Sequence, residues 1–202
     1  MTGVQTCALP ILVTGSEDNT ARLWGLSAKD PAANPVVLRG HDGAVSAVAI
    51  SPDNRWLVTG SYDSTARLWD LSAKDPTANP VVLRRHHGPV LAVAISPDNR
   101  RLVTGSEDNT AWLWDLSAKD PAANPVILRG HDGPVRAVAI SPDNSWLVTG
   151  SDDNTARLWV LQMNDLIDLA HRALGRNFFA DEWQLYFPGE KYRKTFPDLP
   201  GP

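Results

Sequence analysis

Short apolar runs separated by turn sequences recur along the chain. In one copy of this pattern the runs lie at residues 36–38, 45–50, 56–59 and 65–71. The turn Ser51-Pro52-Asp53-Asn54 ends the second run with residue types that favour tight turns. Several runs are apolar at successive positions, which is typical of strands buried on both faces. The pattern predicts four short strands in each copy, and helices of ordinary length do not fit between the turns.

The copies repeat at a fixed offset. The segment Leu-Val-Thr-Gly-Ser starts at Leu12, Leu57, Leu102 and Leu147, which are 45 residues apart each time. Residues 35–79 and 80–124 differ at only nine of 45 positions. Four-stranded sheets that recur about every 40–45 residues and pack face to face are the blades of a β-propeller. The repeat therefore predicts an all-β fold.

Composition excludes several other classes of protein. The 202 residues are 43% hydrophobic and 21% charged, values that are ordinary for a globular protein. The net charge of −4 gives no basic field, so we expect no nucleic-acid partner. No apolar run approaches the roughly 18 residues of a membrane span, so we expect no membrane partner. A single cysteine, Cys7, cannot form an internal disulfide and is too few for a cysteine zinc site.

Three motifs in each copy carry a family resemblance. Gly40-His41, Ser61-x-Asp63-x-Thr65 and Leu68-Trp69-Asp70 resemble the signature of WD-repeat β-propellers. Departures from the signature are Arg85 for its glycine, and Gly25 and Val160 for its aspartate. In that family each sequence repeat begins with the outer strand of the preceding blade. The resemblance therefore implies sheets of three, four, four and three strands, which form an open arc of about three and a half blades.

The chain is interpreted as three segments, residues 1–11, 12–160 and 161–202. The first segment, MTGVQTCALPI, resembles the translation of a sequencing-library adapter, and we expect it to be an artefactual leader. The second contains the repeats. In the third, apolar residues at helical spacing predict a helix over 165–174, and a second helix is expected over 181–186. This tail resembles a segment found after the last blade of large bacterial WD-repeat proteins.

Serine, histidine and aspartate recur together, as in a hydrolase triad. An enzyme needs one such set, whereas here the set returns in each copy together with a tryptophan. The resemblance implies a structural, buried hydrogen-bond chain of Trp, Ser, His and Asp. Its members are His41, Ser61, Asp63 and Trp69; His86, Ser106, Asp108 and Trp114; and His131, Ser151, Asp153 and Trp159. We expect no catalytic, metal or cofactor site, because no ligand cluster and no phosphate-binding loop occurs.

Positions at which the copies differ are candidates for partner binding, although neutral drift explains them equally well. The resemblance implies that several of these positions line the face on which WD-repeat propellers dock proteins. The candidates are Ser46, Tyr62, His87, Leu91, Glu107, Trp112, Arg136 and Asp152. Tyr62, Leu91 and Trp112 are the apolar and aromatic members, which are residue types suited to binding hot spots. We expect a protein or peptide partner rather than DNA, because the candidate residues include as many acidic as basic side chains.

We expect a non-catalytic scaffold for protein–protein interaction, which acts as the sensory or regulatory propeller of a larger bacterial signalling protein in the cytoplasm. One alternative is the accessory propeller of an enzyme whose NTPase, kinase or caspase-like domain lies upstream. Another is a half-propeller that self-assembles into a ring. Self-association of this chain is expected in any case, because each end blade has one uncovered face and uncovered strand edges associate.

Overall fold

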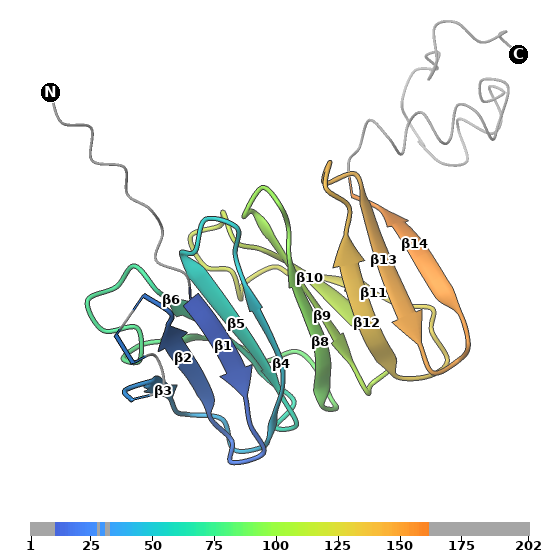
Figure 1. Cartoon of the computed structure of the whole chain (residues 1–202). Helices are drawn as coiled ribbons and strands as arrows, with labels where there is room; N and C mark the ends of the chain where they lie inside the picture. The colour runs from blue at the N-terminus through green and yellow to red at the C-terminus, as the bar shows by residue number, and fades with distance from the viewer. Residues whose placement is uncertain (1–10, 28, 31–32, 162–202) are drawn as a thin grey trace, which may run out of the picture. The chain divides into compact units, whose positions relative to one another are not determined.

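The computed structural model describes residues 11–27, 29–30 and 33–161, which contain fourteen strands in four antiparallel sheets (Figure 1). The chain divides into two compact units, Met1–Trp159 and Val160–Pro202, one residue before the boundary expected between repeats and tail. Most of the expected leader and both expected tail helices, at 165–174 and 181–186, lie outside the described residues.

The sheets follow the chain in order. The first sheet contains β1 (Ile11–Gly15), β2 (Ala21–Gly25) and β3 (Val36–Leu38). The second contains β4 (Val45–Ile50), β5 (Trp56–Ser61), β6 (Ala66–Asp70) and β7 (Val81–Leu83). The third contains β8 (Val90–Ile95), β9 (Arg101–Ser106), β10 (Ala111–Asp115) and β11 (Val126–Leu128). The last contains β12 (Val135–Ile140), β13 (Trp146–Ser151) and β14 (Ala156–Val160).

The expected strand count of three, four, four and three is confirmed, and so is the all-β open arc. Individual strands differ from the expectation at their ends. β1 begins at Ile11 and pairs that residue with Gly25, so the sheet includes the last residue of the expected leader. β5 continues through Gly60 to Ser61, because both residues still pair with β4.

Asparagine residues make the tight turns that join the strands. Asn54, Asn99 and Asn144 have φ of 58°, 61° and 60° and lie between the first and second strands of their sheets. Asparagine adopts this left-handed conformation more readily than most residues with a side chain. The Ser-Pro-Asp-Asn strings identified in the sequence are therefore hairpin turns, which explains why each apolar run ends there.

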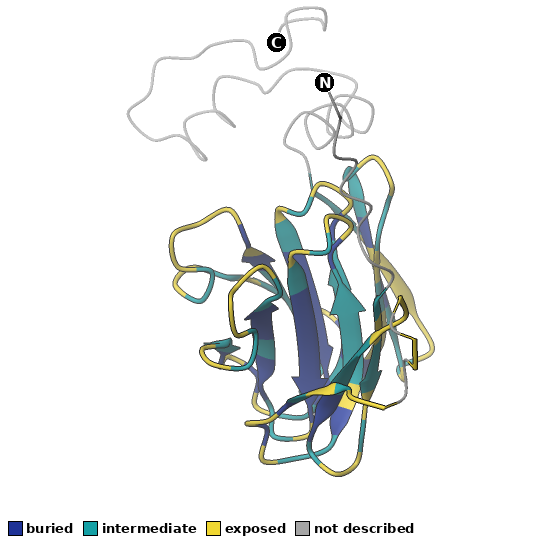
Figure 2. Ribbon diagram, turned by 60° about the vertical axis from the view of Figure 1, so that its left-hand side comes forward, coloured by how far each residue is buried: buried dark blue, intermediate teal, exposed yellow. Residues whose placement is uncertain are grey.

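Neighbouring sheets pack face to face in chain order, with β1 against β4, β4 against β8 and β8 against β12. Figure 1 shows the four sheets side by side in this order. β5 and β9 are buried at every position except the first, which confirms the expectation of strands buried on both faces. Figure 2 shows that buried residues concentrate in the strands and exposed residues mainly in the loops. The core therefore consists of layers between sheets.

The valine that begins β8, and the valine that begins β12, each pack on a glycine of the preceding sheet. A Cβ atom on Gly60 would lie 2.8 Å from Cγ1 of Val90, and one on Gly105 would lie 2.7 Å from Cγ1 of Val135. Such distances are shorter than ordinary van der Waals contact, so a side chain does not fit there without a shift. The glycine of each Thr-Gly-Ser string is thus required by the close approach of the next sheet.

Candidate functional site

Every second connecting loop along the chain lies at the same end of the sheets. These loops are residues 16–20, 39–44, 62–65, 84–89, 107–110, 129–134 and 152–155, and we call this end the loop face. Backbone hydrogen bonds join neighbouring loops. The N–H of Tyr62 donates to the carbonyl oxygen of Ala44 at 2.9 Å, and the N–H of Glu107 donates to that of Pro89 at 2.9 Å. The loop face is therefore a continuation of the strand ladders.

A hydrogen-bonded network runs from the core of the second sheet to the loop face. Nε1 of Trp69 donates to Oγ1 of Thr59 at 3.0 Å, and Nε2 of His41 lies 2.8 Å from the same oxygen. Nδ1 of His41 lies 2.8 Å from Oδ2 of Asp63. Since an ionised carboxylate only accepts hydrogen bonds, Nδ1 carries the proton of the imidazole. The hydroxyl of Thr59 then donates to Nε2.

The same network recurs in the third and last sheets. Its members there are His86, Thr104, Asp108 and Trp114, and His131, Thr149, Asp153 and Trp159. The histidine-to-threonine distance is 2.8 Å in each copy. A fully satisfied buried network of this kind favours one arrangement of its strands. It ties the loop that carries histidine to the turn that carries aspartate.

The structure corrects the role assigned to the serines. Thr59, and not Ser61, links the tryptophan and the histidine. Oγ of Ser61 donates to the carbonyl oxygen of Gly43 at 2.8 Å and accepts the N–H of Asp63 at 3.1 Å. Ser106 and Ser151 make the equivalent bonds. The serines therefore position the aspartate turn, and their hydroxyls are committed to the backbone, which leaves no nucleophile–base pair of the hydrolase kind.

Burial and hydrogen bonding shift the pKa values of the network in opposite ways. Burial lowers the pKa of His41, against the opposing effect of Asp63, so the ring stays neutral. Burial raises the pKa of Asp63, but hydrogen bonds from Thr65, His41 and the backbone outweigh it and lower the pKa to about 2. A neutral imidazole beside an ionised carboxylate matches the proton placement inferred from the hydrogen bonds.

We expect acidification to lower the free energy of unfolding in two steps. Because His41 has a pKa below its ordinary 6.5 in the folded chain, the unfolded chain binds more protons as the pH falls below 6.5, and stability decreases. The contribution of Asp63 is complete above its ordinary pKa of 3.8 and is lost as the pH falls through about 2. Urea denaturation across this pH range measures both steps. His41→Gln should shrink the first step; an unchanged first step would contradict the assignment.

A β-bulge lies next to the loop face in the first strand of the second, third and last sheets, β4, β8 and β12. The pairing register shifts between Val45 and Ala47, and it shifts at the equivalent places in the third and last sheets. The extra residues are Ser46, Leu91 and Arg136, all of them candidates for partner binding. Bulges re-aim side chains and are common beside functional sites. The sequence pattern indicated these positions only by their variation between copies.

Charged and aromatic candidates come together on the loop face. Nε of Arg136 donates to Oδ2 of Asp152 at 2.8 Å, and both side chains are about half exposed. The hydrogen bond to Asp152 and the negative charge of that carboxylate raise the pKa of Arg136, and the charge of Glu107 adds a smaller effect. Arg136 and Asp152 of the last sheet therefore form an exposed ion pair on the loop face, with the negative charge of Glu107 from the third sheet in its vicinity. Tyr62, from the second sheet, is 54% exposed on the same loop face.

An open cleft lies on the loop face between the first and second sheets. Its volume is about 600 Å³, and it is lined by Glu17, Ala44, Val45, Ser46 and Tyr62. Ser46 hydrogen-bonds across sheets, since its hydroxyl donates to the carbonyl oxygen of Val90 at 2.5 Å. The cleft has the volume of a typical small-ligand or side-chain pocket. Two candidates, Ser46 and Tyr62, are thus part of a hollow surface.

The other candidates have different surroundings. His87 is exposed on the loop face, and its backbone N–H donates a hydrogen bond to Oδ2 of Asp108 at 2.9 Å. Trp112 is partly buried on β10 and packs against the core between the second and third sheets. Its ring meets that of His86 edge to face, with centroids 6.3 Å apart, and lies 6.1 Å from that of Trp114. Binding by Trp112 stays a prediction, and its ring already has intramolecular contacts.

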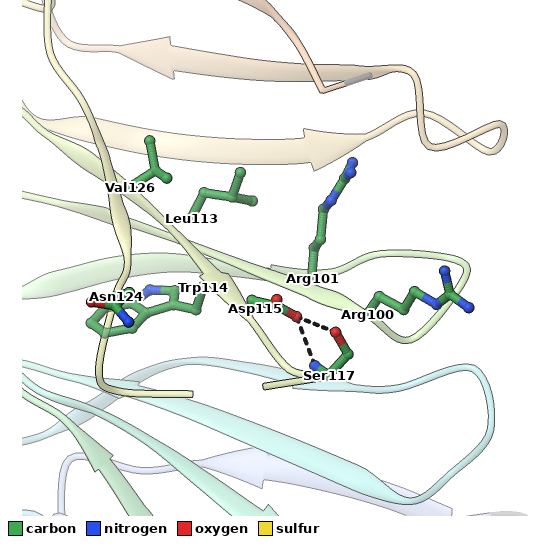
Figure 3. A pocket seen from close by; sticks show the side chains of 8 residues that line it. All are labelled: Arg100, Arg101, Leu113, Trp114, Asp115, Ser117, Asn124 and Val126. Atoms are coloured by element: carbon green, nitrogen blue, oxygen red, sulfur yellow. Dashed lines mark hydrogen bonds between the residues drawn. The ribbon is translucent and has the colours of Figure 1, made fainter. Parts of the chain in front are cut away.

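A second cleft, which the sequence did not indicate, opens at the opposite end of the third sheet. Its volume is about 290 Å³, and Figure 3 shows the side chains that line it. Arg101 lies there at the position that Trp56 fills in the second sheet. The hydroxyl of Ser117 donates to Asp115 at 2.5 Å, and this bond is the main cause of the lowered pKa of Asp115. Both charge signs are therefore present in this cleft.

Within the part of the chain that the structure describes, no group of three or more His, Cys, Asp or Glu side chains is placed to hold a metal ion. Nor does that part contain a helix of the length and hydropathy needed to cross a membrane.

Comparison with known families agrees with this geometry. The family model described as WD domain, G-beta repeat, matches residues 2–25, 34–70, 79–115 and 124–160. The chain belongs to the WD40 repeat family. Each of the last three WD40 matches begins just before an outer strand and ends with the third strand of the next sheet, which confirms the expected offset between repeat and blade. No curated protein matches the chain.

The first WD40 match begins at residue 2 and therefore includes most of the segment interpreted as a leader. That interpretation stays a prediction. WD40 repeats are typically non-catalytic and suggest a scaffold for protein interaction.

Proposed function

We propose that the loop face is a rigid docking platform for a protein or peptide. This proposal rests on the positions at which the repeat copies differ in sequence. Of the nine differences between residues 35–79 and 80–124, five fall in loops of the loop face and a sixth falls at the bulge. Substitution is thus concentrated at one end of a scaffold whose strands are nearly invariant between copies.

The chemistry of this face favours a polypeptide partner. Arg136, Asp152 and Glu107 offer both charge signs, while Tyr62 and Leu91 offer apolar contact. Tyrosine and arginine are frequent hot-spot residues of protein interfaces. The networks hold the loops before binding, which reduces the entropy lost when a partner docks. The further proposal that the chain is the cytoplasmic sensory or regulatory propeller of a larger bacterial signalling protein rests on the resemblance of residues 161–202.

Selection from a displayed library of random peptides tests the docking platform. We expect peptides selected on the unmodified chain to lose about 2 kcal/mol of affinity, or about 30-fold, on Tyr62→Ala or Leu91→Ala. Arg100→Ala is the matched control, because Arg100 is exposed at the opposite end of the third sheet. Both loop-face variants should keep the circular dichroism and melting temperature of the unmodified chain. Peptides that bind all variants equally well would overturn the proposal.

A second candidate function is self-assembly through the two end sheets. Five of the seven large apolar residues that are exposed in the described structure lie on these sheets or directly beside them, namely Leu12, Leu26, Val36, Val148 and Leu158. This concentration favours a contact between copies of the chain.

A further inference from the structure

The first sheet exposes a leucine that every other sheet buries. Leu12 is 49% exposed, whereas the equivalent Leu57, Leu102 and Leu147 are 0% exposed. Leu26, just after β2, is 44% exposed, and its equivalent Leu116 is 8% exposed. Together with Trp24, Leu12 and Leu26 form what we call the first end face. Their equivalents in the second sheet, Leu57, Trp69 and Leu71, pack toward the first sheet.

The last sheet exposes the opposite set of positions. Val148 is 37% exposed and Leu158 is 69% exposed. Their equivalents in the second sheet, Val58 and Leu68, are 0% and 1% exposed, because the third sheet covers them. Together with Ala156, Val148 and Leu158 form the last end face.

These two end faces are the two halves of the contact that joins successive sheets. Between the first and second sheets, Ala21 and Leu38 of one side form a cluster with Leu57 and Trp69 of the other. The equivalent pairing at the chain's ends would bring Ala156 of the last end face against Leu12 and Trp24 of the first. Each end face is thus complementary to the other and not to itself.

We propose that the last end face of one copy packs on the first end face of a second copy, and that two such contacts close a pair. Contacts between two different surfaces close into a ring when the rotation between copies permits it. Two copies contribute eight sheets, a number within the roughly four to eight blades of propellers. The described first sheet has no equivalent of β4, so the contact uses the leucine and tryptophan positions without the valine–glycine packing.

This inference rests on the proposed self-assembly, and the mass of the full 202-residue chain in solution tests it first. Light scattering coupled to size exclusion, at micromolar concentration, should give twice the chain mass of 22.0 kDa. Leu12→Asp and Leu158→Asp should each give the mass of one chain, because each places a charge in both contacts of the pair. The matched control is Tyr62→Asp, whose side chain is similarly exposed but lies on the loop face. This control should remain paired.

Mixing the two variants separates this arrangement from other self-association. A copy with Leu12→Asp keeps its last end face, and a copy with Leu158→Asp keeps its first end face. The mixture should therefore regain one intact contact and form pairs, although neither variant pairs alone. Circular dichroism and a cooperative melt confirm that each variant folds, and Leu12→Ser or Leu158→Ser replaces one that does not.

Each remaining outcome contradicts a defined part of the inference. A single-chain mass for the unmodified protein would overturn self-assembly altogether, including the case in which another segment of the same chain covers the end faces. Pairs that Leu158→Asp blocks but Leu12→Asp does not would show contact between identical end faces and overturn the head-to-tail arrangement alone. Assemblies larger than two copies, stopped by both variants, would overturn the closed pair.

Discussion

Replacement of Thr104 by valine should lower the free energy of unfolding by roughly 2–6 kcal/mol. Oγ1 of Thr104 accepts a hydrogen bond from Nε1 of Trp114 at 3.0 Å and lies 2.8 Å from Nε2 of His86. Thr104 and Trp114 are 0% exposed. Valine nearly preserves the shape of threonine but leaves two buried polar groups without a partner. Each such group costs about 1–3 kcal/mol.

Urea denaturation followed by far-ultraviolet circular dichroism measures this loss. Thr14→Val is the matched control, since Oγ1 of Thr14 accepts only the bond from Trp24 at 3.1 Å within the described residues, and Thr14 is only partly buried. The control should cost about 1 kcal/mol. Thr104→Ser keeps the hydroxyl and should retain most of the stability. Equal losses for Thr104→Val and Thr14→Val would show that the histidine adds nothing to the network.

The fold was predictable because its signals are local and repeated. A Ser-Pro-Asp-Asn turn every 45 residues limits the length of each apolar run, and the structure places Asn54 and its equivalents in the left-handed conformation that such turns need. Repetition then supplies the packing. Because the copies are nearly identical, the two faces of one sheet that pack on its neighbours recur in every sheet. The packing between one pair of sheets therefore predicts the packing between all neighbouring pairs.

The network could be predicted only in part, because alternation along a strand does not fix register. Thr59 and Ser61 are two residues apart, so their side chains lie on the same face of β5. Pairing of Leu57 with Trp69 decides between them, since it brings the tryptophan beside Thr59. The register between two strands depends on contacts between them and cannot be deduced from the sequence of either strand alone.

Departures from the repeat at Arg85 and Trp112 were separate observations in the sequence, yet the structure relates them. In the second sheet the equivalent residues touch, because Nη2 of Arg67 donates to the carbonyl oxygen of Gly40 at 2.6 Å. A Cβ atom on Gly40 would lie 2.9 Å from Nη1 of Arg67, and Gly40 has a φ of 139°. A side chain at the first position would therefore displace the guanidinium group of the second, and in the third sheet both residues are replaced.

Gly105→Ala should lower the free energy of unfolding by about 1–3 kcal/mol. The new Cβ atom would lie 2.7 Å from Cγ1 of Val135 and 3.1 Å from its carbonyl oxygen. Val135 is 0% exposed, so its short side chain has no open space into which it can turn. The third and last sheets must then separate slightly, and the contacts between them weaken. Chemical denaturation of the variant and the unmodified chain gives the difference directly.

Gly150→Ala is the matched control, because Gly150 is the equivalent residue of the last sheet. There the nearest heavy atom to a Cβ is Cβ of Ala137, at 3.6 Å, which is ordinary contact. Both substitutions restrict the unfolded chain alike, which by itself stabilises by about 0.4–1 kcal/mol. The difference between the two variants therefore isolates the close approach of the next sheet. Val135→Ala should relieve part of the cost of Gly105→Ala in a double-mutant cycle, whereas independent effects of the two changes would contradict this packing.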